Sequence, residues 1–182
     1  MTKISKKQDF SVYAQRRKQL IASVVSQYPA ARGAVVLFGG FENERNVFRQ
    51  ESSFYYYSGL SEPGLVLVLE LTGKMILYVP NNGVIKAQWV HSPVSLDTQQ
   101  PSSIAVDEIR MLGKSCAGYQ FHPFFPAQEY SDLLQYLDVQ VKQVNTIFTL
   151  NPTTPFGYIE QRLIIRHLAE FMPTIVYHLQ DV

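Results

Sequence analysis

Two apolar runs separated by three residues constrain the fold of this chain more than any other feature. Leu65 to Leu71 is almost unbroken in apolar character, Met75 to Val79 follows it, and only Thr72-Gly73-Lys74 lies between them. Two β-prone runs joined by a short glycine-containing loop predict a β-hairpin. Because the first run does not alternate with polar residues, we expect it to be buried on both faces in the middle of a sheet, with Glu70 near its end.

A helix is predicted ahead of this hairpin, from Asp9 to Tyr28, because apolar side chains recur there at spacings of three and four residues. Asp9 is suited to cap the first turn, and Pro29 ends the helix. The cluster Arg16-Arg17-Lys18 lies mostly off the apolar stripe. We therefore expect it to form a solvated helix face rather than an anion site.

A buried strand over residues 34–38 is expected next, and it ends at Gly39-Gly40. A strand followed by glycines could cradle a phosphate, but neither phosphate-loop nor dinucleotide-binding glycine spacing is present. The carboxylates of Glu42 and Glu44 follow closely and would repel a phosphate. The glycine pair is therefore interpreted as a turn.

Helices and strands alternate after the hairpin. Helices are expected over residues 84–90, 104–112 and 127–137, and strands over 117–121 and 139–144. This order predicts an α/β fold, a three-layer domain with a mixed β-sheet flanked by helices. Asn151 to Pro155 reads as a linker before a last helix, so we expect one domain over residues 1–150 and a linker and helix over residues 151–182.

Composition narrows the classes of partner. The net charge of +1 favours neither a nucleic acid nor an anionic membrane, and no run approaches the length of a membrane span. Cys116 is the single cysteine, which excludes an internal disulfide and fits a reducing compartment. We expect a cytoplasmic protein. Aromatic residues make up 13% of the chain, which suits an interaction surface.

The residues from Phe48 to Pro80 form a longer pattern. FRQESSFYYYSGLSEPG is followed by an apolar strand, then TGK, then a strand ending in YVP. This pattern resembles the N-terminal domain of the aminopeptidase P and prolidase family, and the resemblance extends to about residue 150. It implies the creatinase/prolidase type of α/β domain, with an RNase H-like motif. Propensity favours a strand from Ser52 to Tyr57, whereas the resemblance implies a short helix that Ser52 could cap.

The resemblance also implies a function. The family consists of metallopeptidases that cut peptide bonds next to proline, with two divalent metals, usually manganese, held by two Asp, one His and two Glu of a C-terminal domain. None of those ligands maps onto this sequence. The chain is therefore expected to be the non-catalytic part of a Xaa-Pro peptidase. Oligomerisation, as a homo-dimer or homo-tetramer, and the edge of the pocket for proline-containing peptides are its implied contributions.

Trp89 is the one candidate site residue. It follows the second hairpin strand at a distance similar to that in the family, where a Trp reaches the substrate pocket of a neighbouring subunit. Val90-His91-Ser92-Pro93 stands in place of the arginine-rich continuation of some members. Trp89 is thus either a pocket-edge or interface residue or ordinary packing. Arg49 and Gln50 match the family motif without a catalytic role to transfer, and Arg49 is expected to pair with a carboxylate or a carbonyl.

Other reactive side chains lack the neighbours that catalysis would need. The histidines lack metal-ligand spacing, Cys116 is expected to be a buried thiol, Ser52 and Ser53 lack a nucleophile context, and three glutamates are close in sequence without forming an acid–base pair. The histidines are His91, His122, His167 and His178, and the glutamates are Glu51, Glu62 and Glu70. No catalytic residue and no metal ligand is therefore predicted in this chain.

A second function remains open from the sequence. The same two-domain family includes a non-enzymatic histone-chaperone relative, so this architecture can also serve as a stand-alone module that binds peptides or proteins. A downstream sequence with the five metal ligands would favour the peptidase, and replaced ligands would favour the binding module.

Overall fold

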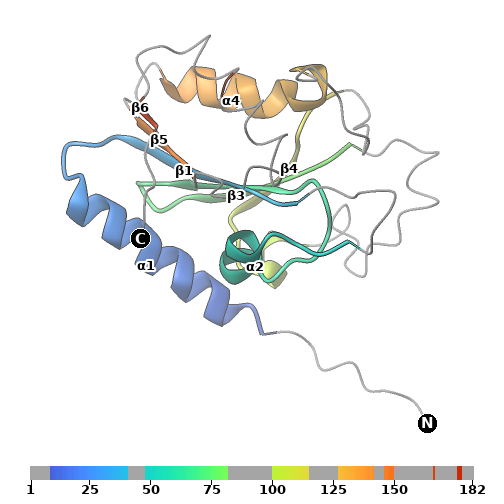
Figure 1. Cartoon of the computed structure of the whole chain (residues 1–182), viewed down its shortest axis with the longest axis horizontal. Coiled ribbons are helices and arrows are strands. Elements are labelled where there is room, and N and C mark those ends of the chain that lie inside the picture. Colours follow the sequence, from blue (N-terminus) through green and yellow to red (C-terminus); the bar gives the residue numbers. More distant parts are fainter. Residues whose placement is uncertain are drawn as a thin grey trace.

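The computed structural model describes residues 9–40, 48–81, 100–114, 127–141, 146–149, 166 and 176–177. Within these residues helices and strands are interspersed along the chain (Figure 1). The helices are α1 (Ser11–Gln27), α2 (Ser52–Ser58) and α4 (Ser131–Val141), with short 3-10 turns η1 (Pro101–Ile104) and η2 (Ala127–Tyr130). The strands are β1 (Gly33–Phe38), β2 (Val66–Glu70), β3 (Met75–Val79), β4 (Glu108–Met111), β5 (Thr146–Phe148) and β6 (Val176–Tyr177).

The strands form one mixed sheet in the order β4-β3-β2-β1-β5-β6. Strand β2 pairs antiparallel with β1 and with β3, whereas the pairs β1–β5, β3–β4 and β5–β6 are parallel. Helices α1 and α2 cover one face of the sheet and α4 covers the other (Figure 1). The expected three-layer α/β fold with a mixed sheet is therefore confirmed.

The predicted hairpin is present, and its first strand occupies the middle of the sheet. Val66 lies opposite Tyr78 and Leu69 opposite Met75, and the intervening turn contains Gly73 at a φ of 104°. Residues Val66 to Leu69 are at most 1% exposed. A strand with helices on both faces needs apolar side chains at every position, which explains the unbroken apolar run.

Alternate side chains of the hairpin pack into two separate hydrophobic cores, one on each face of the sheet. Leu67, Leu69 and Leu77 pack with α1 and α2, and Val68 and Ile76 pack with α4. On the α4 side, the contacting residues include Tyr130, Leu133 and Leu137, as the predicted helical stripe requires. Each fully buried Val or Leu of this kind stabilises the fold by roughly 1.5–3 kcal/mol.

The predicted helix over residues 104–112 is wrong. The chain leaves η1 through Ala105, which has a left-handed φ of 56°, and residues Glu108–Met111 then pair with β3 in parallel. The apolar residues of this stretch fit a helical spacing, but Ile104 and Leu112 face different cores of the sheet. Pairing with the side of β3 that faces away from β2 is more favourable than forming a short helix, because a helix of this length has little stability of its own.

Other predicted elements have mixed outcomes. The helix expected over residues 127–137 is confirmed, with η2 as its first turn, whereas the strand expected over 139–144 is wrong at its start because α4 continues to Val141. The elements predicted over 84–90 and 117–121 lie outside the described residues, as does the last helix except Arg166, which is helical. Among the helices of the described part, none is long and apolar enough to span a membrane.

Candidate functional site

Gln50 connects three segments at the end of strand β1. Its Oε1 accepts hydrogen bonds from the backbone N–H of Gly40 at 2.6 Å and of Glu51 at 2.9 Å, and its Nε2 donates to the carbonyl of Glu62 at 2.7 Å. A Cβ on Gly39 would approach the Gln50 amide to 3.2 Å, so the glycine gives this side chain its space. The Gly39-Gly40 turn is thus a docking point for Gln50, while Arg49 is exposed.

Glu51 caps helix α2. Its carboxylate accepts hydrogen bonds from the backbone N–H groups of Ser53 at 2.9 Å and Phe54 at 2.5 Å, which otherwise have no partner within the helix. The prediction of Ser52 as the cap is therefore wrong, and Ser52 is exposed. Glu51 precedes the helix in an extended conformation with a φ of −59° and a ψ of 132°, so its carboxylate folds over the first turn. The helix implied by the resemblance is confirmed.

Arg17 is buried, which contradicts the expected solvated face. Its side chain is 1% exposed. Nη1 donates to the Tyr57 carbonyl at 2.9 Å, Nη2 donates to the Ala105 carbonyl, and Nε contacts Met75 Sδ at 3.3 Å. One guanidinium therefore joins α1 to α2, to η1 and to the start of β3.

The acceptors of Arg17 explain why a cation is stable there. Tyr57 lies in the last turn of α2, and Ile104 and Ala105 end η1, so the accepting carbonyls lack intrahelical partners and carry partial negative charge. Burial lowers the pKa of Arg17 to about 10, and the charge of nearby Asp107 partly opposes that shift. Arg17 is therefore still charged at neutral pH.

The sequence contained a signal for Arg17 that the prediction did not use. Arg17, Leu20, Ile21 and Val24 are spaced by three, four and seven residues, and all four are buried. Arg17 therefore lies on the apolar stripe, whereas its neighbour Lys18 is exposed. The charge of an arginine favours an exposed position, and a buried arginine needs acceptors that only the tertiary structure supplies.

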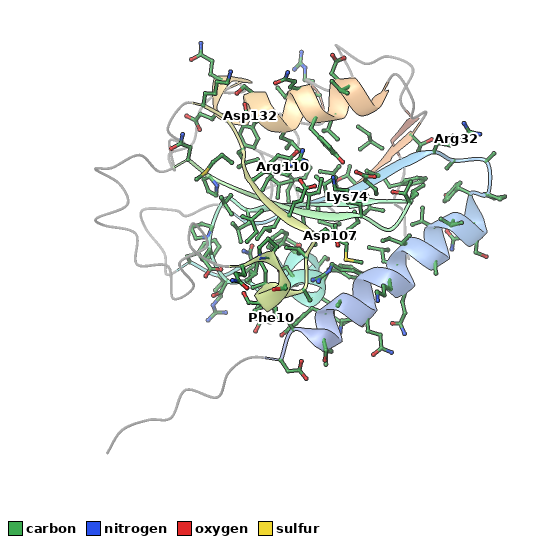
Figure 2. All side chains as sticks on the ribbon, turned by 180° about the vertical axis from the view of Figure 1, so that it is seen from behind. Phe10, Arg32, Lys74, Asp107, Arg110 and Asp132 are labelled. Atoms are coloured by element: carbon green, nitrogen blue, oxygen red, sulfur yellow. The ribbon has the colours of Figure 1, made fainter. Side chains whose placement is uncertain are left out.

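A second polar cluster lies where β3 and β4 meet α4. Lys74 Nζ is 2.6 Å from Glu108 Oε1, and Arg110 Nε donates to Glu108 Oε2 at 2.6 Å. The Arg110 guanidinium also lies over the Tyr136 ring, 4.9 Å from its centroid, and the Tyr136 hydroxyl donates to Glu70. Figure 2 labels Lys74 and Arg110 on this side of the sheet.

The electrostatics of this cluster follow from burial and charge. Burial raises the pKa of Tyr78, which lies beneath it, to about 12. The hydrogen bond from Lys74 lowers the pKa of Glu108, with a further contribution from Arg110. Both tyrosines, Tyr78 and Tyr136, have raised pKa values, so they are neutral at pH 7.

The three glutamates named from the sequence lie in different local environments. Glu51 caps α2, Glu62 is buried at 6% exposure, and Glu70 accepts hydrogen bonds from Thr72 and Tyr136. Within the described residues, no group of three His, Cys, Asp or Glu side chains could hold a metal ion.

Several candidate residues lie outside the part of the chain that the structure describes. They are Trp89, His91, Cys116, His122, His167 and His178. Their proposed roles stay predictions.

Comparison with known proteins places these features in a family. The model of the family described as "Aminopeptidase P, N-terminal domain" matches residues 13–115, which is more than half of the chain. The chain belongs to this family. The matched segment runs from the first turns of α1 to just beyond β4, and it contains Arg17, Gln50 and Glu51.

The aminopeptidase P N-terminal domain of this chain has a human relative described as Xaa-Pro dipeptidase. The two are 34% identical over 104 residues, which cover 52% of this chain and 21% of the human protein.

Solved structures of aminopeptidase P share the fold. Escherichia coli aminopeptidase P with a Glu383Ala change, in complex with substrate, matches with a TM-score of 0.62 and 18% identity over 92% of this chain and 34% of that one. A putative aminopeptidase P from Bacillus anthracis matches with a TM-score of 0.61 and 14% identity, over 94% of this chain and 38% of that one. This chain thus spans about a fifth of the human relative and little more than a third of these structures.

Replacing Arg17 with Met should destabilise the domain by about 2–4 kcal/mol, because the partly buried carbonyls of Tyr57 and Ala105 would lose their donor and the buried site would lose its charged group. Urea unfolding followed by circular dichroism measures this change. Arg16→Met is the matched control: Arg16 donates to the exposed Tyr56 carbonyl at 3.0 Å, so its loss should cost about 1 kcal/mol or less. Equal losses in both variants would contradict the role of Arg17 in joining α1 to α2 and η1.

Replacing Glu51 with Ala should lower the free energy of unfolding by about 1 kcal/mol, because two N–H groups of α2 would lose their acceptor. The control is Ser52→Ala, which removes the hydroxyl that the sequence suggested as the cap. Urea midpoints of the two variants decide the assignment. A larger loss for the Ser52 variant than for the Glu51 variant would refute Glu51 as the cap.

Proposed function

We propose that this chain is the non-catalytic N-terminal part of a metal-dependent Xaa-Pro peptidase, an aminopeptidase P or a prolidase. The observation that carries the proposal is the family match over residues 13–115, supported by the human relative described as Xaa-Pro dipeptidase. In this proposal the chain contributes to oligomerisation and to the edge of the pocket, and the complete protein hydrolyses peptide bonds next to proline in the cytoplasm.

The roles of the motif residues support a structural rather than a catalytic domain. Gln50 and Glu51 use their side chains to hold backbone N–H groups, and Arg17 uses its guanidinium on backbone carbonyls. Each polar group therefore stabilises the positions of loops and helix ends. The described residues do not fit two divalent metals, so the proposal assigns these metals, which the resemblance suggests are manganese, to a separate catalytic domain.

Trp89 is the residue that we propose at the pocket edge. It follows strand β3 by ten residues in the sequence, and β4 resumes the sheet beyond it. The flanking chain is fixed on both sides: Asn81 Nδ2 donates to the Lys114 carbonyl at 3.2 Å, and Arg17 holds Ala105. A Trp side chain offers a rigid apolar face and one N–H donor, which suits a proline ring and its neighbouring peptide group.

The second candidate function, a non-enzymatic binding module, has one observation in its favour. Tyr55 and Tyr56 are 44% and 49% exposed, and Arg16 lies over the Tyr56 ring at 4.0 Å from its centroid. Exposed tyrosines and arginine are common in protein interfaces. Binding of peptides by a longer protein that lacks the five metal ligands would favour this alternative.

If catalysis belongs to a separate domain, the 182-residue chain should be inactive on Xaa-Pro dipeptides and longer Xaa-Pro peptides with added Mn²⁺. The longer protein that contains this domain should be active and should lose activity on chelation, because the metals act as Lewis acids and activate water. Release of the N-terminal residue, followed by chromatography, measures both. Hydrolysis by the 182-residue chain itself would overturn the proposal.

Changing Trp89 to Ala in the longer protein should raise KM for Xaa-Pro substrates by about tenfold, because an apolar wall of the pocket would be lost. Trp89→Phe, which retains an aromatic face, should recover most of the affinity. Thermal melting of each variant controls for folding. An unchanged KM together with a lower melting temperature would assign Trp89 to packing instead.

A further inference from the structure

Strand β4 lies at one end of the sheet. Within the described residues it pairs on one side only, with β3, through the register Ile76–Glu108 to Val79–Met111. The backbone groups on the other side of an edge strand are able to pair with a further strand. The side chain of Met111 is 41% exposed, and those of Glu108 and Arg110 are 35% and 36% exposed, so solvent reaches this edge.

Hydrogen bonds fix both ends of β4 on β3, so the strand offers a defined edge for pairing. The N–H of Asp107 donates to Met75 O at 2.9 Å just before β4, and the N–H of Leu112 donates to Val79 O at 2.8 Å just after it. The Asp107 carboxylate also accepts a hydrogen bond from the N–H of Met75 at 2.7 Å. Both ends of β4 are therefore fixed on β3, and its other edge, which no described residue pairs with, is extended.

The charges on β4 are self-complementary. Glu108 and Arg110 are two residues apart, so their side chains leave the strand on the same face, with Ile109 between them. If a second copy pairs antiparallel about a two-fold axis at Ile109, Glu108 of each copy lies opposite Arg110 of the other. Opposite charges at facing positions of an antiparallel pair are stabilising, and like charges there are destabilising.

Alternative registers lose this complementarity. A two-fold axis at residue 108 places two glutamates opposite each other, and an axis at residue 110 places two arginines opposite each other. Because both unfavourable registers are neighbours of the favourable one, the pair Glu108 and Arg110 selects one alignment.

We propose that β4 is an interface between two copies of this chain, which pair antiparallel about Ile109 and extend the sheet across a two-fold axis. This inference rests on the oligomerisation in the proposed function and locates it. A two-fold axis repeats each contact, so Glu108–Arg110 contacts form twice. Within one copy Glu108 Oε1 already contacts Lys74 and Glu108 Oε2 already contacts Arg110. Each carboxylate oxygen can accept a further hydrogen bond, which the Arg110 of the other copy would donate.

A second copy fits this edge better than an unrelated strand. Short edge strands with charged side chains usually discourage pairing with other chains. A strand without matching charges would cover Glu108 and Arg110 and remove water from them, whereas the same strand in antiparallel orientation supplies both partners. The charge pattern therefore admits a second copy and disfavours other partners.

Charge exchange tests the interface and its register. Sedimentation velocity of the 182-residue chain over a concentration series gives the dimer dissociation constant. Glu108→Arg places arginines opposite arginines, and Arg110→Glu places glutamates opposite glutamates, so each variant should weaken dimerisation by at least about tenfold. The double variant E108R/R110E restores opposite pairs and should recover most of the affinity.

Mixing the two single variants gives the sharpest result. The Glu108→Arg chain carries two arginines on β4 and the Arg110→Glu chain carries two glutamates. A one-to-one mixture should therefore form heterodimers more tightly than either variant forms homodimers. Lys74→Met is the control for the loss of the ion pair within one copy, and it should leave the dissociation constant nearly unchanged. Circular dichroism checks that every variant is folded.

The outcomes separate this inference from the proposed function. A wild-type chain that stays monomeric at several hundred micromolar overturns the interface, whatever the peptidase assay shows. A wild-type dimer that neither single variant weakens, or whose weakened variants do not associate on mixing, places the dimer contact elsewhere and leaves the proposed oligomerisation intact. Association of a different protein that survives both charge changes would also count against a second copy as the occupant.

Discussion

Strand β2 is covered on both faces and paired on both edges. The helices and the neighbouring strands provide the packing and the hydrogen bonds that a strand in this position requires. The strand contributes alternate side chains to the two cores, with Leu67 on the side of α1 and α2 and Val68 on the side of α4. Its backbone pairs with β1 and β3. A strand so placed cannot tolerate a polar side chain on either face without a buried partner. Both helical layers are therefore needed for the stability of the sheet.

The polar groups of the domain act where this layered arrangement leaves backbone groups without partners. Arg17 donates to carbonyls at the ends of α2 and η1, Glu51 accepts from the start of α2, and Gln50 joins the turn after β1 to the loop before β2. These residues hold helix ends and loops, which lie outside the reach of regular hydrogen bonding.

The two charged clusters differ in burial, and this difference sets their roles. The Arg17 site is removed from water, so burial lowers the arginine pKa and the surrounding carbonyls must compensate. The cluster of Lys74, Glu108 and Arg110 is about one-third exposed, and solvent screens its ion pairs. The cluster therefore contributes little to the stability of one copy. The order of Glu108 and Arg110 along β4 instead affects which strand can pair with this edge.

The sequence by itself determined the hairpin, its central burial and the alternation of helices and strands, because unbroken apolar runs and a glycine turn are local signals. It also contained the family pattern over Phe48–Pro80, which the family match over residues 13–115 confirmed. Tertiary structure decided what local spacing could not. Residues 108–111 became a strand because β3 offered an open edge, Glu51 replaced Ser52 as the cap because of the backbone before α2, and Arg17 became buried because carbonyls from two distant segments meet its guanidinium. The partners in these outcomes lie 2 to 88 residues away, and spacing along one helix or strand does not reveal them.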